Sequence, residues 1–215
     1  MLSAWLSGMS VDDFMRQHYQ RAPLALPTTA RDAVPLLDWN TMQRLIESHA
    51  DMLLVRNSKL RREREPETFA EVRALYDEGF SIVLRGCERY DEGLRALAER
   101  FDAEVPGDPS VQIYATPKKH HSFSWHYDCE DVFIAQTAGT KEYFMRRNTV
   151  NPEPMLDAMP RDMHYERETS PMIATTLVAG DWLYIPRGWW HVARALDDSL
   201  SISIGVLSPA AAGKR

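Results

Sequence analysis

The stretch IATTLVAGDWLYIPRGWWHVARALDDSLSISIGV, which covers residues 173–206, decides the fold. It divides into four short runs of apolar and β-branched residues, at 173–178, 182–185, 191–195 and 200–206. Turn residues separate these runs: Gly180-Asp181 follows the first run, and Asp197-Asp198 precedes the last. Short runs of this kind, bounded by glycine and aspartate, predict antiparallel β-strands.

The same pattern extends upstream to about residue 110, and it predicts four further strands, at 111–116, 122–127, 132–136 and 141–147. About eight short antiparallel strands are typical of an all-β core of the jelly-roll type, a double-stranded β-helix. Residues 152–170 interrupt the pattern, because they are long and irregular. We interpret them as a lid or an insertion.

The first half of the chain is predicted to be mainly helical. Helix starts are indicated by Ser10 and Asp38, and Pro66 and Gly79 bracket a third apolar stripe. Residues 91–101 repeat the helical spacing, and a strand is predicted at 80–84. We therefore predict one domain over residues 1–215, with a helical N-terminal part at 1–109 and a jelly-roll core at 110–207.

The bulk composition is that of an ordinary globular protein. The chain has 215 residues, 44% of them hydrophobic, and a net charge of −6, which gives no electrostatic reason to expect nucleic acid or an anionic membrane as a partner. No apolar run reaches the roughly 18 residues of a spanning helix. Two cysteines and an N-terminus without a basic leader favour a cytoplasmic protein.

Three residues form a candidate metal site. His126 and Asp128 are two positions apart, so on the strand predicted there they point to the same side. His191 begins a second predicted strand. Two imidazoles and one carboxylate on one face of a cation are the ligand set of non-haem Fe(II) oxygenases, with open positions opposite. The alternative for each histidine is a hydrogen-bonded side chain in the core.

Two longer motifs surround these ligands. They are HYDCEDVFIAQTAGTK at 126–141 and GDWLYIPRGWWH at 180–191. Both resemble the JmjC-type, cupin-fold 2-oxoglutarate oxygenases, and most closely the asparaginyl hydroxylase and ribosomal oxygenase branches of that family. The opening segment at 14–26 also resembles the ribosomal branch. The resemblance covers most of the chain and is strongest over about residues 110–206.

The resemblance also assigns a co-substrate pocket. A basic residue 15 positions after the first metal histidine binds the distal carboxylate of 2-oxoglutarate in the family, and Lys141 has that spacing from His126. From spacing alone, Lys141 would be an exposed hairpin lysine. Tyr114 matches a tyrosine that lines the pocket, Gln112 lies where the ribosomal branch has an asparagine, and Ser203 lies near a pocket hydroxyl.

The chain also departs from the family pattern. Phe123 replaces a threonine that asparaginyl hydroxylases carry three residues before the first ligand, and Gly205 lies near their late asparagine. The co-substrate's polar contacts are therefore expected to differ from those of that branch. The ribosomal branch continues into further domains, whereas this sequence ends soon after the barrel, which argues against a ribosomal-protein substrate.

The leading hypothesis is an Fe(II)- and 2-oxoglutarate-dependent dioxygenase that hydroxylates a protein or peptide side chain and converts 2-oxoglutarate to succinate. A small-molecule substrate is the nearest alternative. A metal cupin that works without 2-oxoglutarate, or a non-catalytic binding module, would use the same three ligands. The sequence does not indicate the oligomeric state.

Overall fold

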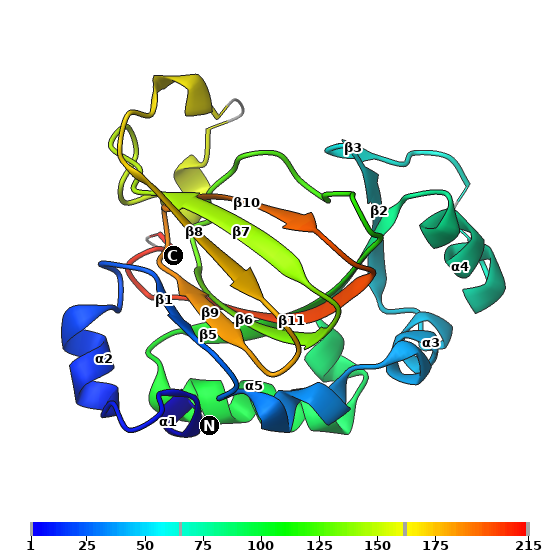
Figure 1. Cartoon of the computed structure of the whole chain (residues 1–215), viewed down its shortest axis with the longest axis horizontal. Coiled ribbons are helices and arrows are strands. Elements are labelled where there is room, and N and C mark those ends of the chain that lie inside the picture. The colour runs from blue at the N-terminus through cyan, green and yellow to red at the C-terminus, as the bar shows by residue number, and fades with distance from the viewer. Residues whose placement is uncertain (1, 65, 161–162, 214–215) are drawn as a thin grey trace.

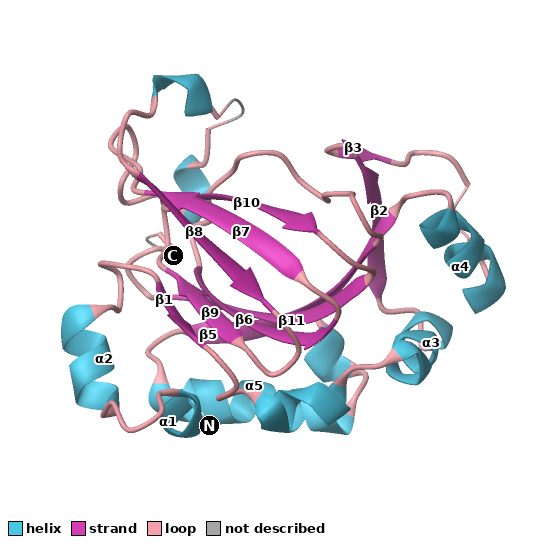
Figure 2. Cartoon of the chain, viewed as in Figure 1, coloured by secondary structure: helices cyan, strands magenta, loops and turns pink. Residues whose placement is uncertain are grey.

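Two antiparallel β-sheets face each other in the computed structural model, which describes residues 2–64, 66–160 and 163–213 (Figure 2). The large sheet has eight strands in the order β1-β9-β6-β11-β5-β4-β2-β3, and the small sheet has three in the order β10-β7-β8. Helices cover the outer face of the large sheet, and the small sheet lies across its inner face (Figure 1). The predicted jelly-roll core is confirmed.

The strands of the large sheet come from both halves of the chain. They are β1 (Leu24–Leu26), β2 (Asp51–Arg56), β3 (Lys59–Leu60), β4 (Ser81–Arg85), β5 (Asp108–Thr116), β6 (Asp131–Ala138), β9 (Trp182–Ile185) and β11 (Ser199–Leu207). The small sheet contains β7 (Lys141–Arg146), β8 (Met172–Leu177) and β10 (Trp190–Ala195).

The helices lie almost entirely in the N-terminal part. They are α1 (Leu2–Trp5), α2 (Val11–Gln17), α3 (Trp39–Glu47), α4 (Phe69–Asp77) and α5 (Glu92–Glu104), with 3₁₀ turns at Arg31–Leu36, Cys87–Arg89, Leu156–Ala158 and Tyr165–Arg167. The side chains of Ser10, Asp38, Thr68 and Asp91 cap the starts of α2 to α5, because each accepts a hydrogen bond from a first-turn backbone N–H. Two of the predicted helix starts, Ser10 and Asp38, are thus confirmed.

On the central strands, side chains point alternately into the hydrophobic core and into the cavity. On β11, Leu200, Ile202 and Ile204 belong to the hydrophobic cluster under the helices. The intervening Ser201 and Ser203 line a cavity between the two sheets. Because successive residues of a strand point to opposite faces, one strand builds both the core and the wall of the cavity.

Two expectations about the strands are corrected. The expected strand at 122–127 does not form, since His126 is the only residue there in a β-bridge, with His191. The backbone of this segment is instead bonded to the turn between β2 and β3, where the Ser58 N–H donates to the Ser122 carbonyl at 3.1 Å. The N-terminal part also adds β1, β2 and β3 to the sheet, which its helical composition did not indicate.

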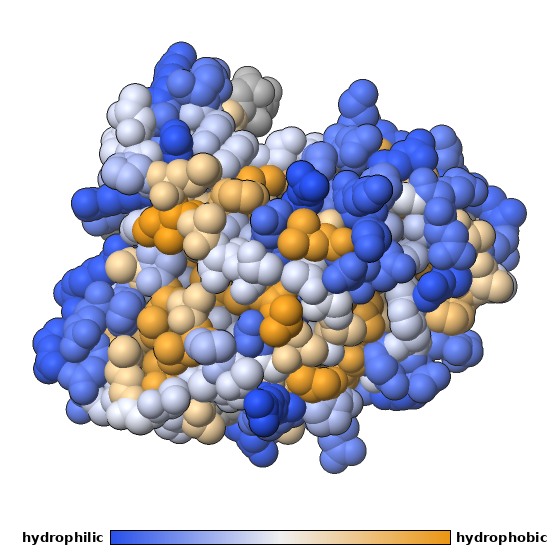
Figure 3. All heavy atoms as spheres, in the orientation of Figure 1, coloured by the Kyte–Doolittle hydropathy of each residue, from blue (hydrophilic) through white to orange (hydrophobic). Residues whose placement is uncertain are grey.

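The segment between β7 and β8, residues 147–171, stands beside the small sheet as the expected insertion, and its residues 161 and 162 lie outside the described ones (Figure 1). The edge strand β8 exposes Met172 and Ile173, and several patches of hydrophobic residues lie on the central part of the face seen in Figure 3. No helix among the described residues is long and apolar enough to cross a membrane.

Candidate metal centre

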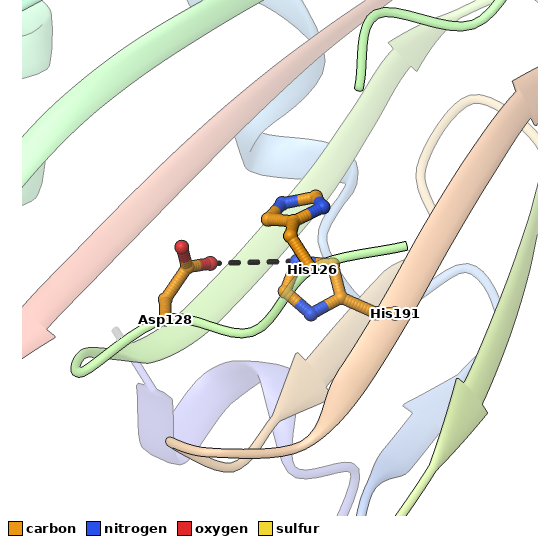
Figure 4. A group of neighbouring side chains, drawn as sticks. All are labelled: His126, Asp128 and His191. Atoms are coloured by element: carbon orange, nitrogen blue, oxygen red, sulfur yellow. Dashed lines mark ion pairs between the residues drawn. The ribbon is translucent and has the colours of Figure 1, made fainter. Parts of the chain in front are cut away.

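Three potential ligands converge in the cavity between the sheets. His126 and Asp128 lie on the segment between β5 and β6, and His191 is the second residue of β10. Their ligand atoms lie within 4.8 Å of one another, the single such group among the described histidine, cysteine and acidic residues. Figure 4 shows the Asp128 carboxylate turned toward His191, whose Nε2 is 3.4 Å from Oδ2. A cation fits between donor atoms at these separations.

Backbone hydrogen bonds fix the orientation of both imidazoles. The Nδ1 of His126 is 2.8 Å from the carbonyl oxygen of Ser124, and the Nδ1 of His191 is 3.0 Å from that of Trp189. A carbonyl only accepts, so Nδ1 carries the proton in each ring. The lone pair of Nε2 is then free on both histidines, which is the tautomer that binds a metal.

The surroundings keep His191 uncharged. Its pKa is lowered to about 4, chiefly by burial and also by the neighbouring His126, while the Asp128 carboxylate acts in the opposite direction. A metal ligand must be deprotonated, so a depressed pKa prepares His191 to bind a cation at neutral pH.

A single cavity of about 760 Å³ contains these ligands and all four residues expected to bind the co-substrate. Its walls include Gln112, Tyr114, Lys141 and Ser203. Gln112 lies opposite Ser203 in the register of β5 and β11. The Tyr114 hydroxyl donates to the Gln112 side-chain oxygen at 3.1 Å, and burial raises the pKa of Tyr114 well above its usual value. Tyr114, Gln112 and Ser203 are therefore neighbours on the cavity face of the large sheet.

Lys141, the first residue of β7, is a buried cation. It is only 4% exposed, and its Nζ donates to the Thr116 hydroxyl at 3.3 Å. The rings of Tyr114 and Tyr143 lie 5.4 and 5.8 Å from the ammonium. No acidic side chain pairs with it in the described part of the chain, and burial lowers its pKa to about 8. A buried charge of this kind is suited to an anionic ligand.

Several cavity residues were not expected from the sequence. Tyr143 lies two residues after Lys141, and Ser201 lies two residues before Ser203. Residues two apart on a strand share a face, so both could have been predicted from the sequence. Glu130 lies beside Gly205, where an added Cβ would be 2.6 Å from the carboxylate, so glycine leaves room for this acid. Burial raises the pKa of Glu130 to about 7, with smaller contributions from Asp128 and Asp108. No local pattern marks Glu130, because its position depends on packing against β11.

Strands of the N-terminal part and the insertion complete the cavity. Leu53, Val83 and Arg85 come from β2 and β4, Ser58 from the hairpin turn, and Met163 from the insertion. Phe123, at the position of the family threonine, also lines it. Cys129, next to Asp128, is buried and lies outside the cavity lining.

Comparison with known protein families gives one family model, described as JmjC domain, which matches residues 94–213 and therefore more than half of the chain. Among curated proteins, the bifunctional lysine-specific demethylase and histidyl-hydroxylase NO66 of Dictyostelium discoideum is 31% identical over 131 residues, which are 61% of this chain and 26% of that protein. Ribosomal oxygenase 1 of Gallus gallus is 27% identical over 222 residues, which cover 96% of this chain and 36% of the relative.

Solved structures give the same fold. The ribosomal oxygenase YcfD from Escherichia coli in complex with cobalt and 2-oxoglutarate is 24% identical, with a TM-score of 0.69 over 94% of this chain and 52% of that one. The X-ray structure of E. coli ycfD gives a TM-score of 0.70 at 22% identity. The chain thus spans about a third or less of the first curated relatives it matches and about half of these structures.

Proposed function

The chain belongs to the JmjC domain family, and on that premise we propose that it is an Fe(II)- and 2-oxoglutarate-dependent hydroxylase. One observation carries the proposal. The His126, Asp128 and His191 donor atoms and the buried ammonium of Lys141 share one cavity. A metal cupin that works without a keto acid has no need of an unpaired buried cation beside its metal, so Lys141 favours 2-oxoglutarate.

The donor set fits ferrous iron. Two neutral imidazoles and one carboxylate hold the ion on one face and leave positions open for a bidentate co-substrate and oxygen. In this proposal His126, Asp128 and His191 are the ligands. When bound, iron supplies the oxygen activation that couples conversion of 2-oxoglutarate to succinate and CO2 with hydroxylation of the substrate.

The chain's own residues bind and orient the co-substrate. Lys141, whose ammonium is oriented by its bond to the Thr116 hydroxyl, offers a donor to the distal carboxylate, and pairing with that anion compensates the burial of the ammonium. Tyr114, Gln112 and Ser203 supply polar contacts along its length. Val132 and Ile134 give the same cavity wall an apolar part.

The substrate proposed is a protein side chain. The relatives are named as a lysine-specific demethylase, a histidyl-hydroxylase and a ribosomal oxygenase. A cavity of about 760 Å³ is near the upper range of small-ligand pockets, so it has room for a side chain besides the keto acid. The Glu130 side chain in its wall offers a polar group that can form a hydrogen bond with such a side chain. Two buried, unpaired cysteines agree with action in the cytoplasm.

The test is succinate formation by the purified protein with Fe(II), ascorbate and 2-oxoglutarate. We expect turnover by the wild-type protein and none by His126→Ala, because one ligand is lost. His49→Asn is the matched control: His49 is exposed at the end of α3 with φ of +57°, a conformation that asparagine tolerates. Equal succinate formation by wild type and His126→Ala would refute the proposed chemistry.

A further inference from the structure

The segment that carries His126 lacks the support that a strand would give it. Among residues 122–128, only His126 makes a β-bridge, through two backbone hydrogen bonds with His191 of 3.1 and 2.8 Å. A strand is held by a ladder of such bonds, whereas a loop must be held by side chains. A metal ligand on a loop therefore needs other groups to fix its direction.

One such support is the turn between β2 and β3. Its Ser58 hydroxyl is 2.6 Å from the Ser124 hydroxyl, in addition to the backbone bond from Ser58 to Ser122. These bonds hold the segment from the side of the N-terminal part. On the opposite side, the segment faces the insertion.

Tyr165 of the insertion packs against the neighbours of both metal histidines. Its ring stacks on Trp125, with centroids 4.1 Å apart and an interplanar angle of 7°. The same ring meets Trp190 edge-on at 5.5 Å, and Trp190 in turn meets Tyr127 edge-on at 4.7 Å. Trp125 and Tyr127 flank His126 in the chain, and Trp190 precedes His191. The Tyr165 ring thus contacts Trp125 and Trp190, which directly precede the two histidine ligands in the sequence.

Hydrogen bonds fix the described ends of the insertion, so the turn that carries Tyr165 can serve as a support. The Glu168 carboxylate is 5% exposed and accepts backbone hydrogen bonds from Thr149, Thr169 and Ser170 at 2.8 to 2.9 Å. Burial would raise the pKa of Glu168, but the bonds from Thr149 and Ser170 lower it below its usual value. The Asn151 amide also donates to the Tyr127 hydroxyl at 3.1 Å. The ends of the insertion are therefore joined to each other and to the metal segment.

We infer that Tyr165 is a positioning residue of the metal centre, which sets the directions of His126 and His191 through Trp125 and Trp190. The inference rests on the proposed function, since it concerns the same three ligands. In this arrangement the 3₁₀ turn at Tyr165–Arg167 supports the metal centre. Groups that orient metal ligands without touching the metal typically change metal affinity by tenfold or more.

The experiment measures Co(II) binding to the full-length apoprotein by titration of the visible absorption bands. Tyr165→Leu removes the ring, and Tyr165→Phe keeps it without the hydroxyl. Tyr90→Leu is the control, because Tyr90 is a surface tyrosine, 42% exposed, outside the cavity. Thermal unfolding of each apoprotein shows which variants are folded. If Tyr165→Leu is unfolded, Trp125→Leu and Trp125→Phe make the same comparison from the other side of the stack.

We expect Tyr165→Leu to bind Co(II) about tenfold more weakly than wild type and to show shifted absorption bands, because the ligand geometry changes. Tyr165→Phe and Tyr90→Leu should match the wild type in affinity and spectrum. Wild-type affinity and spectrum in folded Tyr165→Leu would overturn the inference, and so would equal loss in Tyr165→Phe and Tyr165→Leu. If the wild-type protein itself binds no Co(II), the proposed function fails and this inference fails with it.

Discussion

At the scale of single residues, Lys141, the proposed partner of the co-substrate's distal carboxylate, lowers the stability of the protein without its ligand. Its ammonium is surrounded by a hydroxyl and two aromatic rings, which are weaker partners than a carboxylate. Burial lowers its pKa to about 8, so the folded protein binds this proton less tightly than the unfolded chain does. Because the buried ammonium of Lys141 destabilises the protein without a ligand, we expect an anionic ligand that compensates this free-energy cost when it binds.

Lys141→Met should therefore stabilise the apoprotein at pH 7, by about 2–3 kcal/mol in the free energy of unfolding, because an apolar side chain of similar length replaces a buried charge. Since the folded-state pKa is the lower one, the penalty is complete below pH 8 and fades as the pH rises from about 8 toward the unfolded value of 10.5. Urea unfolding at pH 7 and pH 10 measures the difference. A variant less stable than wild type at pH 7, or a difference that grows with pH, would contradict this account.

The same substitution should weaken 2-oxoglutarate binding by about 1.5–3 kcal/mol, the scale of a hydrogen bond to a charged group. For wild type, affinity should fall as the pH rises above the lysine pKa of about 8, because only the protonated amine pairs with the distal carboxylate. Calorimetric titration of the Mn(II)-loaded protein between pH 7 and 9.5 measures both effects. In Lys141→Met the pH dependence over this interval should be absent; its persistence would assign the titration to another group.

The residues of the site differ in how far the sequence could predict them. His126, Asp128 and His191 could be predicted as a group, because metal coordination demands particular side chains at a spacing that a strand pair can deliver. Lys141 needed the family resemblance, because spacing alone favoured an exposed lysine. Glu130 could not be predicted, since it reaches the cavity only because β11 has a glycine at position 205.

At the scale of elements, the turn between β6 and β7 decides where Lys141 lies. Gly139 has φ of +67°, and an added Cβ there would be 2.1 Å from the carbonyl oxygen of Asp198. The turn therefore needs glycine both for its conformation and for its space. It brings β7 back beside β8 and β10, where Lys141 pairs with Leu177 and Ala195.

Gly139→Ala should destabilise the protein by more than about 2 kcal/mol, because the left-handed conformation alone costs about 1–2 kcal/mol and the backbone must also move. Gly8→Ala is the control. Gly8 has φ of +92°, and no atom lies within 4 Å of an added Cβ, so the free energy of unfolding should fall only by the conformational term. Unfolding in urea compares the two. Equal losses would mean that contact with Asp198 is unimportant.

Elements were predicted well where local sequence determines them, and less well where long-range pairing does. The caps at Ser10 and Asp38 and the strand after Gly180 depend on neighbouring residues. The segment at 122–127 has a strand-like composition, yet it forms no ladder: its backbone bonds are one from the turn at Ser58 to Ser122 and the isolated bridge between His126 and His191. Likewise, β2 becomes a strand because it pairs with β4, which nothing within β2 indicates.

At the scale of the whole molecule, one hydrophobic core joins the N-terminal part to the barrel. Trp5 of α1 is fully buried and lies against Phe101 of α5 and Trp182 of β9, with centroids 5.6 and 5.8 Å apart. The Trp182 indole N–H donates to the Trp5 carbonyl at 2.8 Å. Because helices and sheet bury the same surface, we propose that residues 1–109 and 110–207 fold as one domain.

Trp5→Ala should then destabilise the entire protein by about 3–5 kcal/mol, since it leaves a large cavity between the helices and the sheet. If the chain is one cooperative unit, far-ultraviolet circular dichroism and tryptophan fluorescence should report the same midpoint in urea for wild type and variant. Leu60→Ala is the control: Leu60 is 46% exposed on β3, so the change should be within about 0.5 kcal/mol. Separate midpoints for the two signals, in wild type or variant, would mean that the helical part and the barrel unfold independently. The proposed metal ligands would then depend on the barrel alone, even though β2 and β4 line their cavity.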